Sequence, residues 1–169
     1  MSRRRRSSRR GFTLIEASLA IVIVGTGCLA AMELFATVSI SNKEARRLTV
    51  GSQLARHLEE AMAHLPYDDP ITRSANWGPE PGETLDTFND VDDFDGFDTE
   101  GTDGPVDALR LAIPELSQFS QVVEVTRVDD MTLSEPGTGA LRIDVTVLWQ
   151  AQPGSEQKEV ARTSWYRMP

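Results

Sequence analysis

The segment that most constrains this chain is an apolar run from Phe12 to about Ala36, in which Glu16 and Glu33 are the only charged residues. A helix rises about 1.5 Å per residue, so Phe12 to Glu33 would span about 32 Å, roughly the hydrocarbon thickness of a bilayer. We predict a membrane-spanning helix with Glu33 at the far interface. Glu16 would lie inside the apolar region, where a carboxylate is costly and is expected to have a function.

The charge of the chain is divided between its start and its body. Six of the 17 basic residues precede the apolar run: Arg3, Arg4, Arg5, Arg6, Arg9 and Arg10. Such a block favours an N-terminus on the cytoplasmic side of a membrane. Without the first eleven residues the chain has 11 basic and 26 acidic residues, a net charge of about −15. A body this acidic argues against nucleic-acid binding, which requires a basic surface.

The helical pattern continues beyond the membrane segment. Apolar or small residues recur at spacings of three and four: Leu48, Gly51, Ala55, Leu58, Met62 and Leu65. Pro66 ends the pattern, so we predict one helix from Phe12 to Leu65, about 80 Å long. Its second half is amphipathic, and its apolar stripe must pack against another element.

A long acidic loop is predicted between the helix and the strands, at residues 67–105. Half of the 26 acidic residues of the chain lie between Asp68 and Asp107, and proline and glycine are frequent there. This composition is typical of a surface loop with at most one short helical turn. Loops of this length within compact domains are usually functional or partly disordered.

Four segments near the C-terminus are rich in β-branched and aromatic residues and are predicted to be strands: Asp107–Ile113, Gln121–Val128, Leu141–Trp149 and Glu159–Met168. The sequence QPGS at 152–155 predicts a turn, so the last two segments would form a hairpin. We therefore predict an α+β fold in which a long N-terminal helix packs its amphipathic half on a small antiparallel sheet.

The sequence RGFTLIE at residues 10–16, with its basic leader and the apolar helix that follows, resembles the class III signal of type IV pilins and type II secretion pseudopilins. The resemblance implies cleavage between Gly11 and Phe12 by the prepilin peptidase, a membrane aspartyl protease that also methylates the new amino group of Phe12. It implies that Glu16 pairs with the N-terminal amine of a neighbouring subunit during assembly.

This resemblance also implies a domain organisation and a location. Residues 1–11 would be a removed leader, residues 12–41 a helix in the inner membrane and later in the filament core, and residues 42–169 a globular domain on the periplasmic or extracellular side. The partners would be other pilin or pseudopilin subunits, the prepilin peptidase and inner-membrane lipid. No nucleophile elbow, phosphate loop, CxxC pair or zincin motif indicates an enzyme.

Two finer interpretations concern the kind of protein. The segments VGTGCLAAMELF and EARRLTVGSQLARHLEEAMAHLP resemble V-type minor pilins and I-type pseudopilins, and Cys28 is the only cysteine, so the paired-cysteine loop of major pilins is missing. The alternative is an exported periplasmic or single-pass membrane-anchored binding protein, because SRRGF at residues 8–12 imitates a twin-arginine signal. The two differ in the mass of the mature protein.

A calcium ion is a possible cofactor of the acidic loop. Residues 89–101 contain five aspartates around Gly96, namely Asp90, Asp92, Asp93, Asp95 and Asp98. Oxygen-rich and flexible segments suit Ca²⁺, although this spacing does not fit the EF-hand template. The alternative is a solvated loop without a metal.

Overall fold

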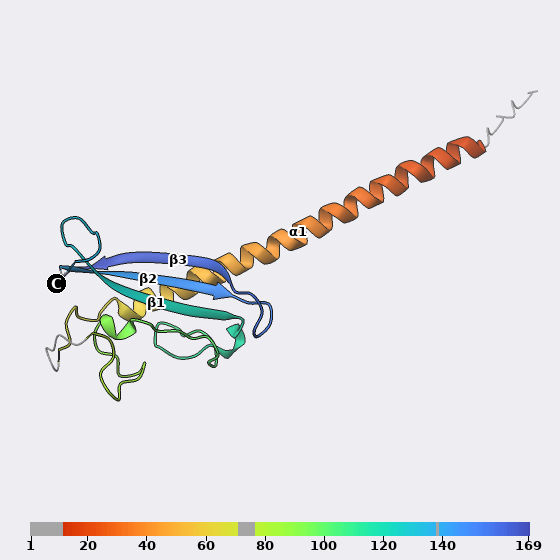
Figure 1. Cartoon of the computed structure of the whole chain (residues 1–169). Helices are drawn as coiled ribbons and strands as arrows, with labels where there is room; N and C mark the ends of the chain where they lie inside the picture. The colour runs from red at the N-terminus through yellow and green to blue at the C-terminus, as the bar shows by residue number, and fades with distance from the viewer. Residues whose placement is uncertain (1–11, 71–76, 138) are drawn as a thin grey trace, which may run out of the picture. The chain divides into compact units, whose positions relative to one another are not determined.

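The computed structural model describes residues 12–70, 77–137 and 139–169. Its elements are helix α1 (Leu14–Met62), the short 3₁₀ helices η1 (Asp92–Phe94) and η2 (Pro114–Leu116), and strands β1 (Phe119–Val128), β2 (Ala140–Trp149) and β3 (Lys158–Arg167) (Figure 1). The strands form an antiparallel sheet in the order β1-β2-β3. This is the predicted α+β arrangement of one long helix and a small sheet.

The chain divides into two compact units, Met1–Glu44 and Ala45–Pro169. In the first unit the described residues form only the N-terminal part of α1 and the two residues before it. The second unit contains the last turns of α1, the sheet and the long segment between them. Each unit is considered separately below.

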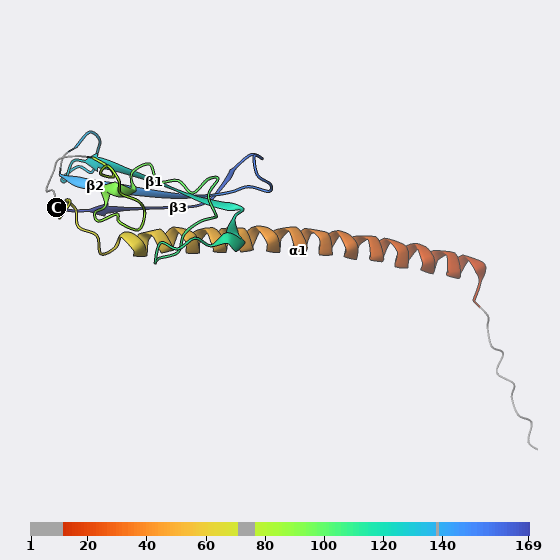
Figure 2. The same cartoon turned by 90° about the horizontal axis from the view of Figure 1, so that it is seen from below.

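In the second unit, α1 lies along one face of the sheet (Figure 2). The buried residues of this helix are Gly51, Leu54, Ala55, Leu58 and Met62. They meet a sheet face built from alternate strand residues, among them Val123, Val125, Ile143, Val145 and Val147. The predicted stripe is therefore confirmed from Gly51 to Met62, whereas Leu48 is 46% exposed and Leu65 lies beyond the end of the helix. One residue before Leu48, the guanidinium of Arg47 lies 3.6 Å from the ring centroid of Trp149 in β2. Arg47, rather than Leu48, therefore contacts the sheet at this turn of the helix.

Helix α1 is shorter than predicted at both ends, since it begins at Leu14 and ends at Met62. The residues after Met62 tighten into a turn in which the Leu65 amide donates to the Met62 carbonyl at 3.1 Å. The guanidinium of Arg167, at the end of β3, donates to the carbonyls of Ala63 and Leu65 at 3.2 and 2.6 Å. A cation at a helix C-terminus satisfies the carbonyls that the helix leaves free.

The hairpin of β2 and β3 forms as predicted, with a turn in which the Ser155 amide donates to the Gln152 carbonyl. The register shifts between Val147 and Leu148, which pair with Ala161 and Glu159, so Val160 bulges out of the ladder. Val160 is buried and faces α1, where Gly51 makes room for it. A Cβ on Gly51 would lie 2.8 Å from a methyl group of Val160.

The prediction of a strand at Asp107–Ile113 is wrong. Only an isolated bridge between Val106 and Ala112 forms there, and Arg110 has a φ of 64°. That left-handed conformation breaks an extended backbone. It is accompanied by two hydrogen bonds from the Arg110 guanidinium to the carbonyls of Leu85 and Phe88, at 3.0 and 2.7 Å.

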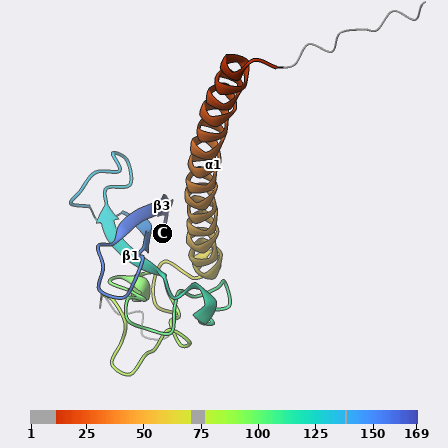
Figure 3. The same ribbon diagram turned by 90° about the vertical axis from the view of Figure 1, so that its right-hand side faces the viewer.

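The acidic segment lies beside β1 and the last turns of α1 (Figure 3). Gly96 and Thr99 donate their amides to the carbonyls of Val123 and Gln121, and the Val123 amide donates to the Phe97 carbonyl. Segment 95–99 therefore covers the free edge of β1, an edge that could otherwise pair with another chain. Val91 and Phe94 join the core, so the solvated-loop interpretation does not describe this segment.

Candidate functional site

Thr13 and Glu16 form reciprocal hydrogen bonds that cap the N-terminus of α1. The Thr13 amide and hydroxyl both donate to Glu16 Oε2 at 2.9 Å, and the Glu16 amide donates to Thr13 Oγ1 at 3.3 Å. This is a capping box, in which an N-cap hydroxyl and a carboxylate three residues later satisfy free helix amides. The negative carboxylate also lies at the positive end of the helix dipole. Gly11, the predicted cleavage residue, lies outside the described residues.

The remainder of α1 in the first unit presents apolar side chains outward. Phe12 and Leu14 are 85% and 88% exposed, and the large apolar residues as far as Ile40 are also exposed. The hydroxyls of Ser18, Thr26 and Thr37 donate to backbone carbonyls one turn earlier. Side-chain hydroxyls satisfied in this way are compatible with lipid or with a neighbouring helix. By length and composition, α1 can cross a membrane.

Three of the predicted calcium ligands accept hydrogen bonds from backbone amides, and one of them also accepts from an indole. Asp95 accepts hydrogen bonds from the Val125 amide at 3.0 Å and from the Trp77 indole at 2.7 Å. Asp92 accepts from the Gly78 amide at 3.1 Å, and Asp98 accepts from the Glu100 amide at 2.7 Å. These carboxylates fix turns and the edge of β1. Among the described residues, none of these three belongs to a group of acidic side chains whose oxygens lie close together.

Asp90 and Asp93 lie deeper, with exposed fractions of 3% and 1%. Burial, followed by the charges of Asp92 and Asp93, raises the pKa of Asp90 to about 8. Burial also raises the pKa of Asp93, although the amides of Asn89 and Asp90 donate to Asp93 Oδ2 at 2.7 and 3.2 Å. The other oxygen, Asp93 Oδ1, is buried and has no hydrogen-bond partner.

Two glutamates from an earlier turn approach Asp93. One carboxylate oxygen from each of Glu80, Glu83 and Asp93 lies within 4.8 Å of the others. Burial and the adjacent Glu83 raise the pKa of Glu80. The side-chain amide of Asn89 donates to Glu83 Oε1 at 2.9 Å, and its own oxygen, Oδ1, is buried without a partner. Of the five predicted ligands, the structure brings only Asp93 into this group.

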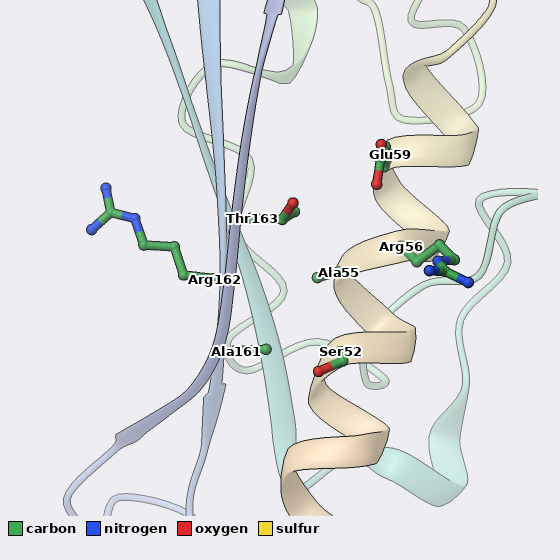
Figure 4. Close-up of a pocket in the computed structure, with 7 residues that line it drawn as sticks. All are labelled: Ser52, Ala55, Arg56, Glu59, Ala161, Arg162 and Thr163. Atoms are coloured by element: carbon green, nitrogen blue, oxygen red, sulfur yellow. The ribbon is translucent and has the colours of Figure 1, made fainter.

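A separate cavity of about 220 Å³ lies between α1 and β3, and its lining residues are Ser52, Ala55, Arg56, Glu59, Ala161, Arg162 and Thr163 (Figure 4). Ser52, Ala55, Ala161 and Thr163 point into it, whereas Arg162 points away from the helix. The Ser52 hydroxyl donates to the Leu48 carbonyl at 2.9 Å. The cavity is a gap between small side chains and brings no charged pair together.

Two sets of residues in these polar groups were not predicted from the sequence. Thr13 could have been found, because threonine followed three residues later by glutamate before an apolar run is the signature of a capping box. Glu80 and Glu83 could not, because loop conformation alone brings them to Asp93. A search by composition favours the densest run of aspartates, which contains Asp93 but neither glutamate.

Comparison with known proteins identifies the N-terminal segment. A family model described as the prokaryotic N-terminal methylation motif matches residues 6–32. No curated protein and no solved structure matches the chain. The match covers Phe12, the capping box and the first turns of the exposed apolar helix. Residues 6–32 of this chain are therefore the prepilin-type signal of type IV pilins and pseudopilins.

Proposed function

We propose that this protein is a minor pilin or pseudopilin, a structural subunit of a type IV pilus or of a type II secretion pseudopilus. The observation that carries the proposal is the methylation motif at residues 6–32, which continues directly into an exposed apolar helix. The presence of a single cysteine in the whole sequence supports a minor over a major subunit. The motif is typical of structural proteins rather than enzymes.

In this proposal the prepilin peptidase removes residues 1–11 and methylates the amino group of Phe12. The arginines before the cut hold the N-terminus on the cytoplasmic side of the inner membrane, and the domain after α1 is exported. The apolar surface of α1 packs first against lipid and then against the helices of other subunits. Small residues, among them Gly25 and Gly27, let helices approach closely, and a Cβ on either would meet nothing within 4 Å in the isolated chain.

Glu16 has two successive partners in this account. Before assembly its carboxylate accepts hydrogen bonds from Thr13, and these bonds together with the helix dipole lower the cost of its charge in the membrane. During assembly the carboxylate meets the ammonium of Phe12 on a neighbouring subunit. A buried ion pair that lacks one member costs about 3–5 kcal/mol, which is enough to select the axial register of the helices.

Incorporation into filaments tests this role. We expect Glu16→Ala to be processed and retained in the membrane but to be depleted at least about tenfold in sheared filaments, because a loss of 3–5 kcal/mol exceeds the 1.4 kcal/mol of one decade. Glu33→Ala is the matched control, since it removes the other carboxylate of the apolar run, and it should incorporate normally.

Glu16→Gln separates capping from charge pairing. Its amide oxygen can still accept from Thr13, but it cannot neutralise an ammonium. If Glu16→Gln enters filaments as well as the wild type, the carboxylate acts only as a helix cap, and the proposed assembly role is wrong.

A further inference from the structure

Asp98 and Arg162 lie at the two ends of one row of residues across the sheet. Asp98 forms an isolated antiparallel bridge with Val122 of β1. Val122 pairs with Thr146 of β2, which pairs in turn with Arg162 of β3. Residues paired in this way point their side chains to the same face of a sheet. The row therefore carries a carboxylate at one end and a guanidinium at the other, on the face away from α1 (Figure 4).

The backbone N–H and C=O groups at both ends of this row point away from the sheet. In the Asp98–Val122 bridge the flanking residues make the hydrogen bonds, so the backbone groups of Asp98 face the other way. Hydrogen-bonded and non-hydrogen-bonded pairs alternate along the row. Val122 exchanges its bonds with Thr146, and Arg162 therefore directs its backbone groups to the free edge of β3. Outside the β2–β3 ladder, no backbone bond to either end residue forms among the described residues.

The two edges of the sheet also carry opposite charge. Residues 80–107, which include the segment that covers β1, contain eleven acidic residues and no basic one. Strand β3, at the opposite edge, contains three basic residues and one acidic residue. Asp98 is exposed, and the side chain of Arg162 is 52% exposed. Because β1 and β2 separate the two edges, the charges are complementary between molecules rather than within one.

We infer that a second copy of this chain docks head to tail on the free edge of β3, with Asp98 of one copy opposite Arg162 of the other. The free backbone groups of these two residues complete a hydrogen-bonded antiparallel pair, and their opposite charges lie side by side on one face. The strand directions agree, because segment 95–99 is antiparallel to β1 and hence also to β3 of a copy in the same orientation. Such a heterologous contact leaves a free edge for a further copy.

Both side chains can take a new partner without loss to the fold. Asp98 accepts only from the nearby Glu100 amide, at 2.7 Å. Arg162 reaches Asp144 at 3.4 Å, and Asp144 keeps its closer bonds to Arg142 and Ser164 when Arg162 turns away. The contact lies entirely within the second unit, so this inference does not depend on the proposed assembly through α1.

Analytical ultracentrifugation of the full-length protein in detergent tests the inference. We expect association that increases with protein concentration in about 50 mM NaCl and weakens in about 500 mM NaCl, because salt screens exposed charges. Arg162→Glu and Asp98→Arg should each weaken association by about tenfold, since each replaces an attraction by a repulsion. An equal mixture of the two variants should associate like the wild type, because each copy then meets a neighbour of opposite charge.

Glu124→Arg is the matched control, because Glu124 is an exposed carboxylate of β1 that does not end the row. It should associate like the wild type. Arg162→Gln removes the charge without placing a carboxylate beside Asp144, and it should weaken association by about threefold. Circular dichroism checks the folding of each variant. All of them leave α1 unchanged, so association through the apolar helix is common to all.

A wild-type protein that remains monomeric in low salt would overturn the inference, and the charges of β3 would then only protect its edge from pairing. Association that Asp98→Arg and Arg162→Glu leave unchanged, or that Glu124→Arg weakens as much, would place the contact elsewhere and also overturn it. So would a mixture of the two charge-reversed variants that associates no better than either variant alone.

Discussion

Single polar residues in the core connect the elements of the second unit. Gln121 is fully buried on the sheet face toward α1, where its Nε2 donates to the Leu54 carbonyl at 2.9 Å and to the Val106 carbonyl at 3.1 Å. Its Oε1 accepts from the Val106 amide at 2.7 Å. One side chain thus satisfies backbone groups of the helix and of the loop. Strand alternation places Gln121 inward but says nothing about these partners, which come from distant segments.

Gln121→Leu should destabilise the fold by about 2–4 kcal/mol, because it leaves the buried amide and carbonyl of Val106 without this partner and removes a second hydrogen bond from the Leu54 carbonyl. The measurement is the urea unfolding midpoint of the full-length chain in detergent. Gln118→Leu makes the same chemical change at an exposed position and should alter stability little. Equal effects of the two substitutions would show that the bonds of Gln121 contribute nothing specific.

Asp144 lies on the opposite face of the sheet, with a side chain that is 6% exposed. Burial alone would raise its pKa, but the Ser164 hydroxyl and Arg142, whose Nε donates at 2.8 Å, outweigh burial and hold the pKa of Asp144 below its ordinary value of 3.8. Arg162 adds an ion pair at 3.4 Å. The charged form is therefore the one that stabilises the fold.

A lowered pKa means that the contribution of Asp144 is fully present above pH 3.8 and is lost as the pH falls through the folded-state value. Asp144→Asn should cost about 1–2 kcal/mol at neutral pH, a modest value because both arginines are partly exposed. The stability difference between wild type and Asp144→Asn should shrink below pH 3.8 in acid unfolding experiments. A difference that stays constant down to low pH would contradict the assigned role.

At the scale of elements, the sequence identified the long helix and three strands because their periodicities are intrinsic to the chain. The strand predicted at Asp107–Ile113 failed because two contacts from Arg110 to another loop stabilise a left-handed backbone, and periodicity carries no information about such contacts. The acidic loop was misjudged for a related reason. Aspartates usually face solvent, but here Asp95 binds the amide of Val125 and so replaces a strand partner at the edge of β1.

The close approach of α1 to β3 depends on Gly51. Alanine would favour the helix by up to about 1 kcal/mol, but its Cβ would lie 2.8 Å from Val160 Cγ2 in a packed interface. Overpacking costs about 1–3 kcal/mol, so we expect Gly51→Ala to destabilise the fold by about 1 kcal/mol net. In a double-mutant cycle, Val160→Ala should cost less in the Gly51→Ala background than alone. Additive effects would exclude the steric explanation.

For the whole molecule, the decisive information lies in the first fifth of the chain. The leader, Gly11, Phe12 and Glu16 predicted the prepilin-type signal, and the methylation motif at residues 6–32 confirms it. The positions of Glu80 and Glu83 beside Asp93 could not be predicted in this way, because loop conformation brings these residues together without any sequence pattern. The linear motif was thus predictable from the sequence, whereas contacts that depend on loop folding were not.

The mass of the mature protein tests the central claim most directly. We predict that the intact mass of the protein purified from membranes lacks the contribution of residues 1–11 and includes one added methyl group. Gly11→Val should retain the leader, since the new side chain lies at the predicted cut. Loss of 30 or more residues would instead indicate ordinary export with signal cleavage. An unshortened wild-type protein, or a Gly11→Val variant that is still cut after residue 11, would contradict the assignment of this chain as a processed pilin or pseudopilin.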